Sequence, residues 1–219
     1  MVVTYNKTRV IRKLSTFMMI LFLAGNGFSQ EQNSNANKEP KTTFIIKIND
    51  TIYTLSEGEI LKFHSTLEQP EISVRLADFK KFDNENISFD YPKYFSFEFE
   101  EDYGYKGWTF DGNNFVIMCF EFDAKIELDD VVNEVINQFG KDNCIIEKVQ
   151  IKLGKKILAG RRINISLFGQ KLTMDYLEII LSDSKSRFIV FQDSKNEDGS
   201  DSKESIETMK IIDNSIKYK

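Results

Sequence analysis

A two-residue alternation of apolar and polar side chains recurs along most of the chain after residue 43. Alternation of this period places one set of side chains in a core and the other in water, which is typical of antiparallel strands. The run FVIMCFEF is apolar on both faces, so we expect it to be a central strand that is covered on both sides. The segments that we predict as strands are 44–48, 51–55, 72–76, 87–91, 95–99, 108–110, 115–122, 145–153, 157–167, 172–181 and 187–192.

Short turn sequences separate several of these strands. Asn49-Asp50 lies between the first two and indicates a hairpin. Asp111-Gly112 precedes the all-apolar run, and we expect Gly112 to supply the positive φ that a tight hairpin turn needs. Turns at Gly154-Lys155, Gly169-Gln170 and Asp183-Ser184 divide the last four strands into an antiparallel meander.

Only two segments have helical periodicity. Apolar residues at i, i+3, i+4 and i+7 predict a helix over 129–139, with Asp129 and Asp130 at its start and Gly140 after its end. A second stripe predicts a helix over 202–216, for which Asp201 and Glu204 form a start resembling a capping box. The stripe consists of Ile206, Met209, Ile212 and Ile216. The predicted class is therefore α+β, with antiparallel strands and two helices.

The first 29 residues have the form of a secretory signal peptide. They contain four basic residues and no acidic one, then an apolar run from Leu14 to Ala24, then Gly27-Phe28-Ser29 before a cut ahead of Gln30. The apolar run is too short to span a bilayer, so we expect no membrane span. We predict that the protein is exported and is periplasmic or extracellular. Cysteine is absent near the cut, so a lipid anchor is not expected.

The remaining chain divides into three parts. Residues 30–42 are polar and cannot bury enough surface to offset the entropy of ordering, so we predict a flexible tether. Residues 43–82 form a β-rich N-terminal addition. Residues 83–219 form the α+β core domain.

The order of elements from Ile87 to about Ile216 resembles the Mog1/PsbP-like fold family. The resemblance rests on the strand ISFDYP at 87–92, a paired strand, a hairpin at Asp111-Gly112, a helix, the meander and the closing helix. Many relatives have a Trp soon after the Pro, whereas Pro92 is followed by Lys93-Tyr94-Phe95. The resemblance implies an antiparallel sheet with flanking helices, and a binding or assembly factor rather than an enzyme.

Charge and composition exclude several kinds of partner. The chain has 29 Lys and Arg against 34 Asp and Glu, a net charge of -5. Removal of the signal peptide removes only basic charge, which leaves an even more acidic protein. This balance argues against nucleic acid and anionic membrane surfaces. The single His64 cannot form a multi-histidine metal site, and we find no phosphate loop and no Cys-x-x-Cys, so we predict no cofactor.

A group of aromatic and acidic residues is the candidate ligand site. Tyr103, Tyr105 and Trp108 stand beside Glu98 and Glu100, and such rings combine apolar area with a polar end that can hold a sugar or a peptide. The favoured alternative is that the rings form a sheet core and the acids form its wet face. A hydrolase that uses acidic residues is the competing enzymatic hypothesis, with Glu98, Glu100, Asp102 or Glu121 as acid and base.

Two further candidates involve thiols and basic residues. Cys119 and Cys144 permit one disulfide in an exported protein, although two buried thiols are the favoured interpretation. His64 could act as a base for either thiol, but we expect it to be a loop histidine. Basic pairs at 155–156 and 161–162 indicate either a small anion patch or, as we favour, solvated charges near a turn.

The segment 196–201, NEDGSD, is similar to a calcium loop. Against the EF-hand template, however, Ser194 and Ser205 occupy the two strongest ligand positions, so we expect a solvated loop rather than a metal site. Taken together, the sequence predicts an exported, non-catalytic binding or assembly factor for a protein or a cell-envelope component. A secreted hydrolase of an envelope or extracellular polymer is the alternative.

Overall fold

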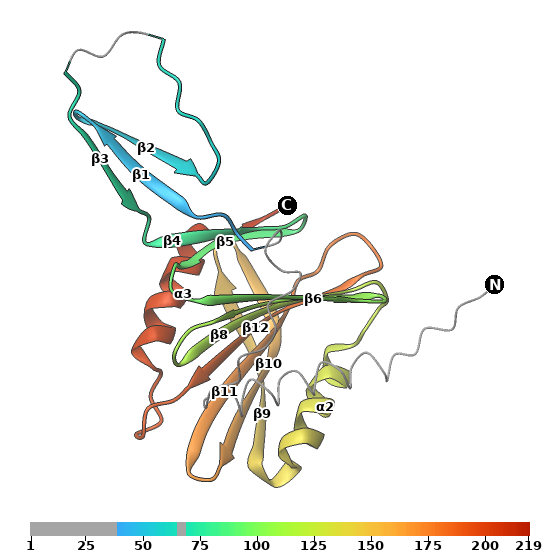
Figure 1. Cartoon of the computed structure of the whole chain (residues 1–219). Coiled ribbons are helices and arrows are strands. Elements are labelled where there is room, and N and C mark those ends of the chain that lie inside the picture. Colours follow the sequence, from blue (N-terminus) through green and yellow to red (C-terminus); the bar gives the residue numbers. More distant parts are fainter. Residues whose placement is uncertain (1–38, 65–68) are drawn as a thin grey trace.

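The computed structural model describes residues 39–64 and 69–219. This part of the chain is an α+β fold of mostly antiparallel sheets with two α-helices (Figure 1). The predicted signal peptide, residues 1–29, and most of the predicted tether lie outside the described residues. Within the described part, no helix is long and apolar enough to cross a membrane.

A seven-stranded antiparallel sheet forms the body, in the order β6-β7-β8-β12-β11-β10-β9. The all-apolar run is β8, which is buried along its whole length and pairs with β7 and β12, so its predicted central position is confirmed. The predicted four-strand meander is confirmed as β9 to β12. The bounds are β6 Ser96–Asp102, β7 Tyr105–Asp111, β8 Phe115–Phe122, β9 Cys144–Leu153, β10 Lys156–Leu167, β11 Gln170–Glu178 and β12 Ser186–Ser194.

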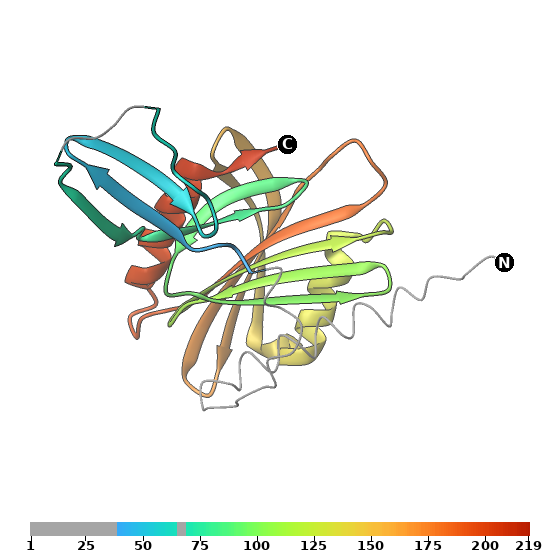
Figure 2. The ribbon, with the colours of Figure 1, turned by 45° about the horizontal axis from the view of Figure 1, so that its top comes forward.

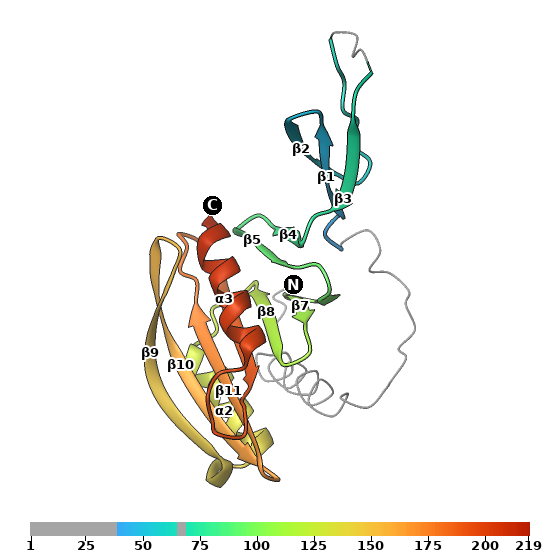
Figure 3. The same cartoon turned by 90° about the vertical axis from the view of Figure 1, so that its left-hand side faces the viewer.

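The two faces of this sheet carry separate hydrophobic clusters, because alternate residues of each strand point to opposite sides. The first, which we call the α2-side core, contains Val116, Met118, Phe120 and Phe122 of β8 together with residues of α2 (Leu128–Phe139). The second, the α3-side core, contains Phe115, Ile117 and Cys119 together with residues of α3 (Lys203–Ser215). Figure 3 shows α3 in front of the sheet and α2 behind it.

The ends of α2 agree with the predicted helix to within one residue. Its inward stripe is confirmed, since Val132, Val135 and Ile136 are buried. Gly140 ends the helix with φ 86°, a conformation that glycine adopts without steric cost. A 3-10 turn, η2 (Lys141–Asn143), then leads into β9.

The start of α3 differs from the predicted capping box. Ser202, not Asp201, is the N-cap, and its side-chain oxygen accepts a hydrogen bond from the N–H of Ser205 at 3.0 Å. Glu204 does not reach back to the cap but binds the turn between β7 and β8 instead. Ile212 is fully buried, whereas Ile206 of the predicted stripe is largely exposed.

Gly112 has a different role from the predicted one. Its φ is not among the positive values in the structure, so the turn does not need glycine for its backbone conformation. A Cβ atom at this position would lie 2.7 Å from the ring of Phe95 and 2.9 Å from the carboxyl carbon of Glu204. Glycine is therefore needed because a ring and a carboxylate pack directly against the turn.

A second, three-stranded sheet has the order β13-β5-β4, with bounds β4 Phe79–Asp83, β5 Ile87–Pro92 and β13 Lys217–Tyr218. β5 is almost wholly buried, and Phe82 of β4 packs in the α3-side core. The boundary that we predicted between residues 82 and 83 falls inside β4. β4 pairs with β5 along its whole length, and its Phe82 is buried.

The third sheet contains the rest of the predicted N-terminal addition, in the order β2-β1-β3. β1 (Thr43–Ile48) and β2 (Thr51–Ser56) form the predicted hairpin, and β3 (Ile72–Leu76) pairs with the other side of β1. This sheet stands away from the body and meets it near β4 (Figures 1 and 3).

Candidate functional site

An aromatic strip runs along one face of the β6–β7 hairpin. The register pairs Phe97 with Phe110, Phe99 with Trp108, and Glu101 with Lys106. Cross-strand partners share a face, so all three pairs lie on the side of the α3-side core. The ring of Trp108 lies 5.6 Å from that of Phe99 and 5.8 Å from that of Phe82, between centroids. The strip thus passes from buried rings to a charged pair at its outer end.

A pocket of about 420 Å³ opens where this strip meets β4 and the segment before β1. Trp108 and Phe99 form its aromatic wall, and the rest of its lining is mostly polar. The lining residues are Glu39, Pro40, Lys41, Lys81, Phe82, Asp83, Asn84, Phe99, Lys106 and Trp108. The pocket is therefore an open depression with one aromatic side and charged walls.

Lysines outnumber carboxylates around this pocket. Asp83 contacts Lys81 at 3.7 Å and also binds Lys219, whose hydrogen bond is the main cause of the lowered pKa of Asp83. Lys106 contacts Glu101 at 3.9 Å.

The segment before β1 adds further charge to the pocket. Glu39 contacts Lys80 at 2.5 Å, and Lys41 is exposed at the rim. Each carboxylate named around the pocket contacts a lysine. The additional lysines leave a net positive charge around the pocket, although the chain as a whole is acidic.

Of the five predicted ligand residues, only Trp108 lies in this pocket. Glu98 pairs with Thr109 and Glu100 with Gly107, so both carboxylates point to the opposite face of the hairpin. Tyr105 is buried in the α2-side core. Tyr103 is 71% exposed at the β6–β7 turn. The structure therefore distributes the predicted cluster over two faces and a turn.

Tyr105 has a packing role on its face. Its ring stacks on Phe120 at 6.1 Å and packs against Phe122 at 5.4 Å. The ring also covers Gly107, where any Cβ would collide with the tyrosine hydroxyl. Burial raises the pKa of this hydroxyl, which has no hydrogen-bond partner among the residues that the structure describes.

A carboxylate pair that the sequence did not indicate occupies this same face. Asp111 pairs with Ser96, so it lies diagonally across from Glu98 on the face away from Trp108. Burial and the nearby charges of Glu98 and Glu204 raise the pKa of Asp111 from 3.8 to about 6. Desolvation also raises the pKa of Glu98. We predicted Asp111 only as a turn residue, because nothing in its local pattern indicates the partial burial.

Glu121, one of the predicted hydrolase carboxylates, belongs to a buried ion-pair network. Arg187 Nε donates to it at 2.9 Å, Lys185 Nζ at 2.9 Å and Asn86 Nδ2 at 2.6 Å. Arg187 also forms two hydrogen bonds with Asp183, at 2.7 and 2.6 Å. Burial raises the pKa of Glu121, but the hydrogen bonds from Lys185 and Arg187 outweigh it and the net shift is downward. This carboxylate is held ionised, which does not suit a general acid.

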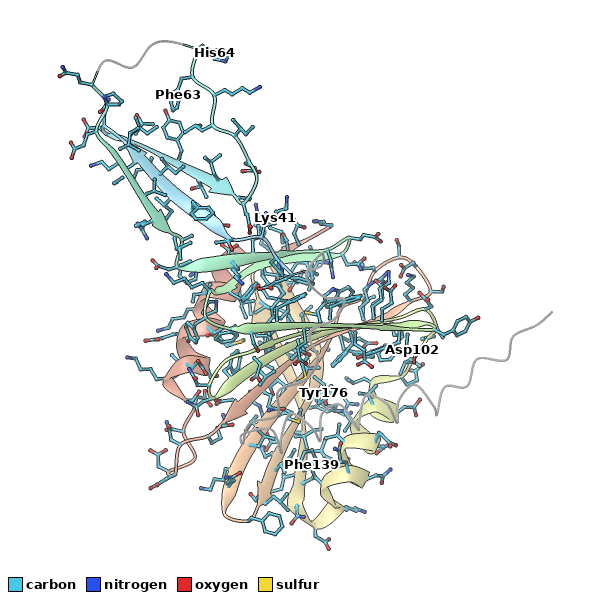
Figure 4. The ribbon with its side chains drawn as sticks, in the orientation of Figure 1. Lys41, Phe63, His64, Asp102, Phe139 and Tyr176 are labelled. Carbon is cyan, nitrogen blue, oxygen red and sulfur yellow. The ribbon has the colours of Figure 1, made fainter. Side chains whose placement is uncertain are left out.

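The thiols and the histidine lie in three different places. Cys119 is buried in the α3-side core, and Cys144 packs against the α2-side core; both are free. Burial raises the pKa of each thiol, which disfavours the reactive thiolate. His64 lies at the outer end of the N-terminal sheet (Figure 4), whereas Cys119 and Cys144 lie in β8 and β9 of the body. The fold therefore does not place His64 beside either thiol as a base.

Several of the remaining basic and acidic candidates are bound to other residues. Arg162 forms two 2.7 Å hydrogen bonds with Asp175, and Arg161 pairs with Asp129 at 2.9 Å. In the calcium-like loop, Asp198 accepts hydrogen bonds from Ser200, and Asp201 pairs with Lys195. Among residues 39–64 and 69–219, no group of three or more His, Cys, Asp or Glu could hold a metal ion.

Comparisons with known proteins give a distant structural similarity but no family. No family model matches the chain, and no curated protein matches it. Among solved structures, it is similar to LpqN, described as involved in cell envelope biogenesis of Mycobacterium tuberculosis. The sequences are 14% identical, the similarity covers 60% of this chain and 82% of LpqN, and the TM-score is 0.36. A similarity at this level assigns neither a family nor a function.

The lysines of the pocket were missed by sequence reasoning. Lys106 is two residues before Trp108, so strand periodicity alone places both on one face. Lys41 and Lys81 come from segments that are distant in sequence and meet the hairpin only through the β4–β5 sheet. No local sequence pattern indicates that these segments lie beside the hairpin.

Proposed function

We propose that the protein is an exported, non-catalytic binding factor with a Mog1/PsbP-like core, a sheet flanked by two helices. Its ligand is an acidic glycan or glycoconjugate of the cell envelope. The observation that carries the proposal is Trp108, which forms the aromatic wall of a pocket whose charged walls include Lys41, Lys81 and Lys106.

The chemistry of the pocket matches a sugar that carries a carboxylate or phosphate. The face of an indole ring packs well against the apolar face of a sugar ring. Lysine donates to carboxylate and phosphate oxygens, and it does so without a strict geometry. An open depression of this kind suits one end of a chain or one acidic unit within it.

Fluorescence titration provides the test, because Trp108 is the only tryptophan in the chain. We expect oligogalacturonate, a carboxylated sugar chain, to change the emission of Trp108, and a neutral galactose oligomer to change it much less. Calorimetry should show that Trp108→Ala weakens oligogalacturonate binding about tenfold and Lys106→Gln about fivefold.

Lys203→Gln is the matched control, since Lys203 is a solvent-exposed lysine of α3 outside the pocket. We expect this variant to bind oligogalacturonate with unchanged affinity. Equal binding of neutral and acidic oligomers, or full affinity in both pocket variants, would refute the proposal.

A hydrolase is the second candidate, and Asp111 is the observation that favours it. A carboxyl group with a pKa of about 6 beside a second carboxyl group is the arrangement of a general acid and its partner. Turnover of envelope polysaccharides that falls about 100-fold in Asp111→Asn and in Glu98→Gln would support it. Turnover that both variants retain, or no turnover between pH 4 and 8, would dismiss it.

A further inference from the structure

Strand β3 is an open edge of the N-terminal sheet. Among the described residues it pairs with β1 only, and Figure 2 shows it as an outer strand of this sheet. Ile72, Val74 and Leu76 are 56%, 60% and 47% exposed. Natural edge strands are usually protected by Pro, Lys or a bulge, and β3 has no Pro, no Lys and a continuous register with β1.

The backbone of β3 presents hydrogen-bonding groups outward at the same positions. The N–H of Ala77 donates to the carbonyl of Thr43, and the carbonyl of Glu71 accepts from the N–H of Asn49, both at 2.8 Å. Odd-numbered residues of β3 therefore bond to β1. In an antiparallel ladder the alternate residues direct their N–H and C=O groups to the other side, which here is the free edge.

One face of the three strands is largely apolar. Ile72, Val74 and Leu76 stand opposite residues of β1 that are themselves apolar, namely Ile48, Ile46 and Phe44. The same face continues on β2 with Tyr53 and Leu55. A strand added to β3 would extend this apolar face and would also satisfy the free backbone groups.

We propose that β3 pairs with β3 of a second copy of the chain, antiparallel and centred on Ser73, to form a continuous six-stranded sheet. In this register Ile72 faces Val74 of the other copy. Glu71 faces Arg75 of the other copy, and the two-fold axis repeats this pair, so each dimer contains two opposite-charge pairs.

Charge complementarity selects both the register and the partner. Centring on Val74 would place Glu71 opposite Ala77 and Arg75 opposite Ser73, which pairs no charges. Centring on Arg75 would place two arginines opposite each other, which is repulsive. Both Glu71 and Arg75 are exposed, and the contact of Arg75 with Asp78 at 3.4 Å is solvent-exposed and weak.

Sedimentation equilibrium of the full chain over a wide concentration range tests the dimer. We expect a reversible monomer–dimer equilibrium that Val74→Pro abolishes, because proline removes an outward N–H that β1 does not use. Ile52→Pro is the matched control. Ile52 is an exposed residue of the other edge strand, β2, so we expect this variant to dimerise as the unmodified chain does.

A charge exchange separates pairing between copies from folding of one copy. Arg75→Glu and Glu71→Arg should each weaken dimerisation about tenfold, and the double exchange should restore it. Within one strand the two residues lie about 13 Å apart, so restoration can arise only between copies. A protein that stays monomeric, a dimer that survives Val74→Pro, or a double exchange without recovery would each overturn the proposal.

Discussion

Asp111 shows how one side chain can make stability depend on pH. Its pKa is raised from 3.8 to about 6 in the folded protein, chiefly by burial and then by the charges of Glu98 and Glu204. The native state therefore binds more protons than the unfolded state between these values. The stabilisation is complete below about pH 4 and is lost as the pH rises through 6.

We therefore expect Asp111→Asn to flatten this part of the stability profile. Urea unfolding at pH 4.5 and 7.5 should show that the unmodified protein loses more free energy of unfolding between the two values than the variant does. Asp142→Asn, on an exposed position of η2, should leave the difference unchanged. A steeper loss in Asp111→Asn than in the unmodified protein would contradict the assignment.

At the scale of single residues, the sequence predicts where a given residue type is needed. It predicts the physical reason for that need less reliably. Gly112 was correctly placed at a turn, but its reason is the approach of Phe95 and Glu204 rather than backbone conformation. Glu204 was assigned to a helix cap, yet its carboxylate accepts hydrogen bonds from the N–H groups of Asn114 and Phe115. The contacts of Glu204 with this turn join segments about 90 residues apart, which no local pattern can report.

Strands and helices were predictable where their periodicity was long and regular. The buried pattern of β8 and the stripe of α2 each depend on a contiguous segment, and both predictions are confirmed. β4 was not predicted because FKKFD has two lysines among five residues, and only its pairing with β5 makes it a strand. The candidate pocket was largely unpredictable for the same reason, since β4 supplies one of its walls.

The ion-pair network around Glu121 fixes two strands and the turn before β5, and its loss should be costly. Glu121→Leu would leave Arg187 buried, with only Asp183 as a partner. Removing one member of a buried pair leaves a charge without compensation, so we expect a loss of about 3 kcal/mol in the free energy of unfolding.

Asp123→Asn is the control for this network. Its carboxylate contacts Lys185 at the margin of the network and is mostly exposed, so its removal should cost less than about 1 kcal/mol. Similar losses in the two variants would show that the network does not act as a buried unit.

At the scale of the whole molecule, β4 connects the N-terminal sheet with the body. It follows β3 directly in sequence but pairs with β5, and its Phe82 lies in the α3-side core. In the N-terminal sheet, by contrast, no residue of β2 is fully buried and every residue of β3 is exposed. The body therefore contains its own core and should not depend on β1–β3 for folding.

Two truncations test this division against a chain that begins at Glu39. A chain that begins at Ala77 retains β4 and should unfold cooperatively, with a free energy of unfolding within about 1 kcal/mol of the longer chain. A chain that begins at Asn84 lacks Phe82 and exposes Phe89 of the α3-side core, so it should lose at least about 3 kcal/mol. Both quantities come from urea titrations followed by the fluorescence of Trp108. If the chain from Ala77 did not fold, the N-terminal sheet would be part of the folding unit, and the division at β4 would be wrong.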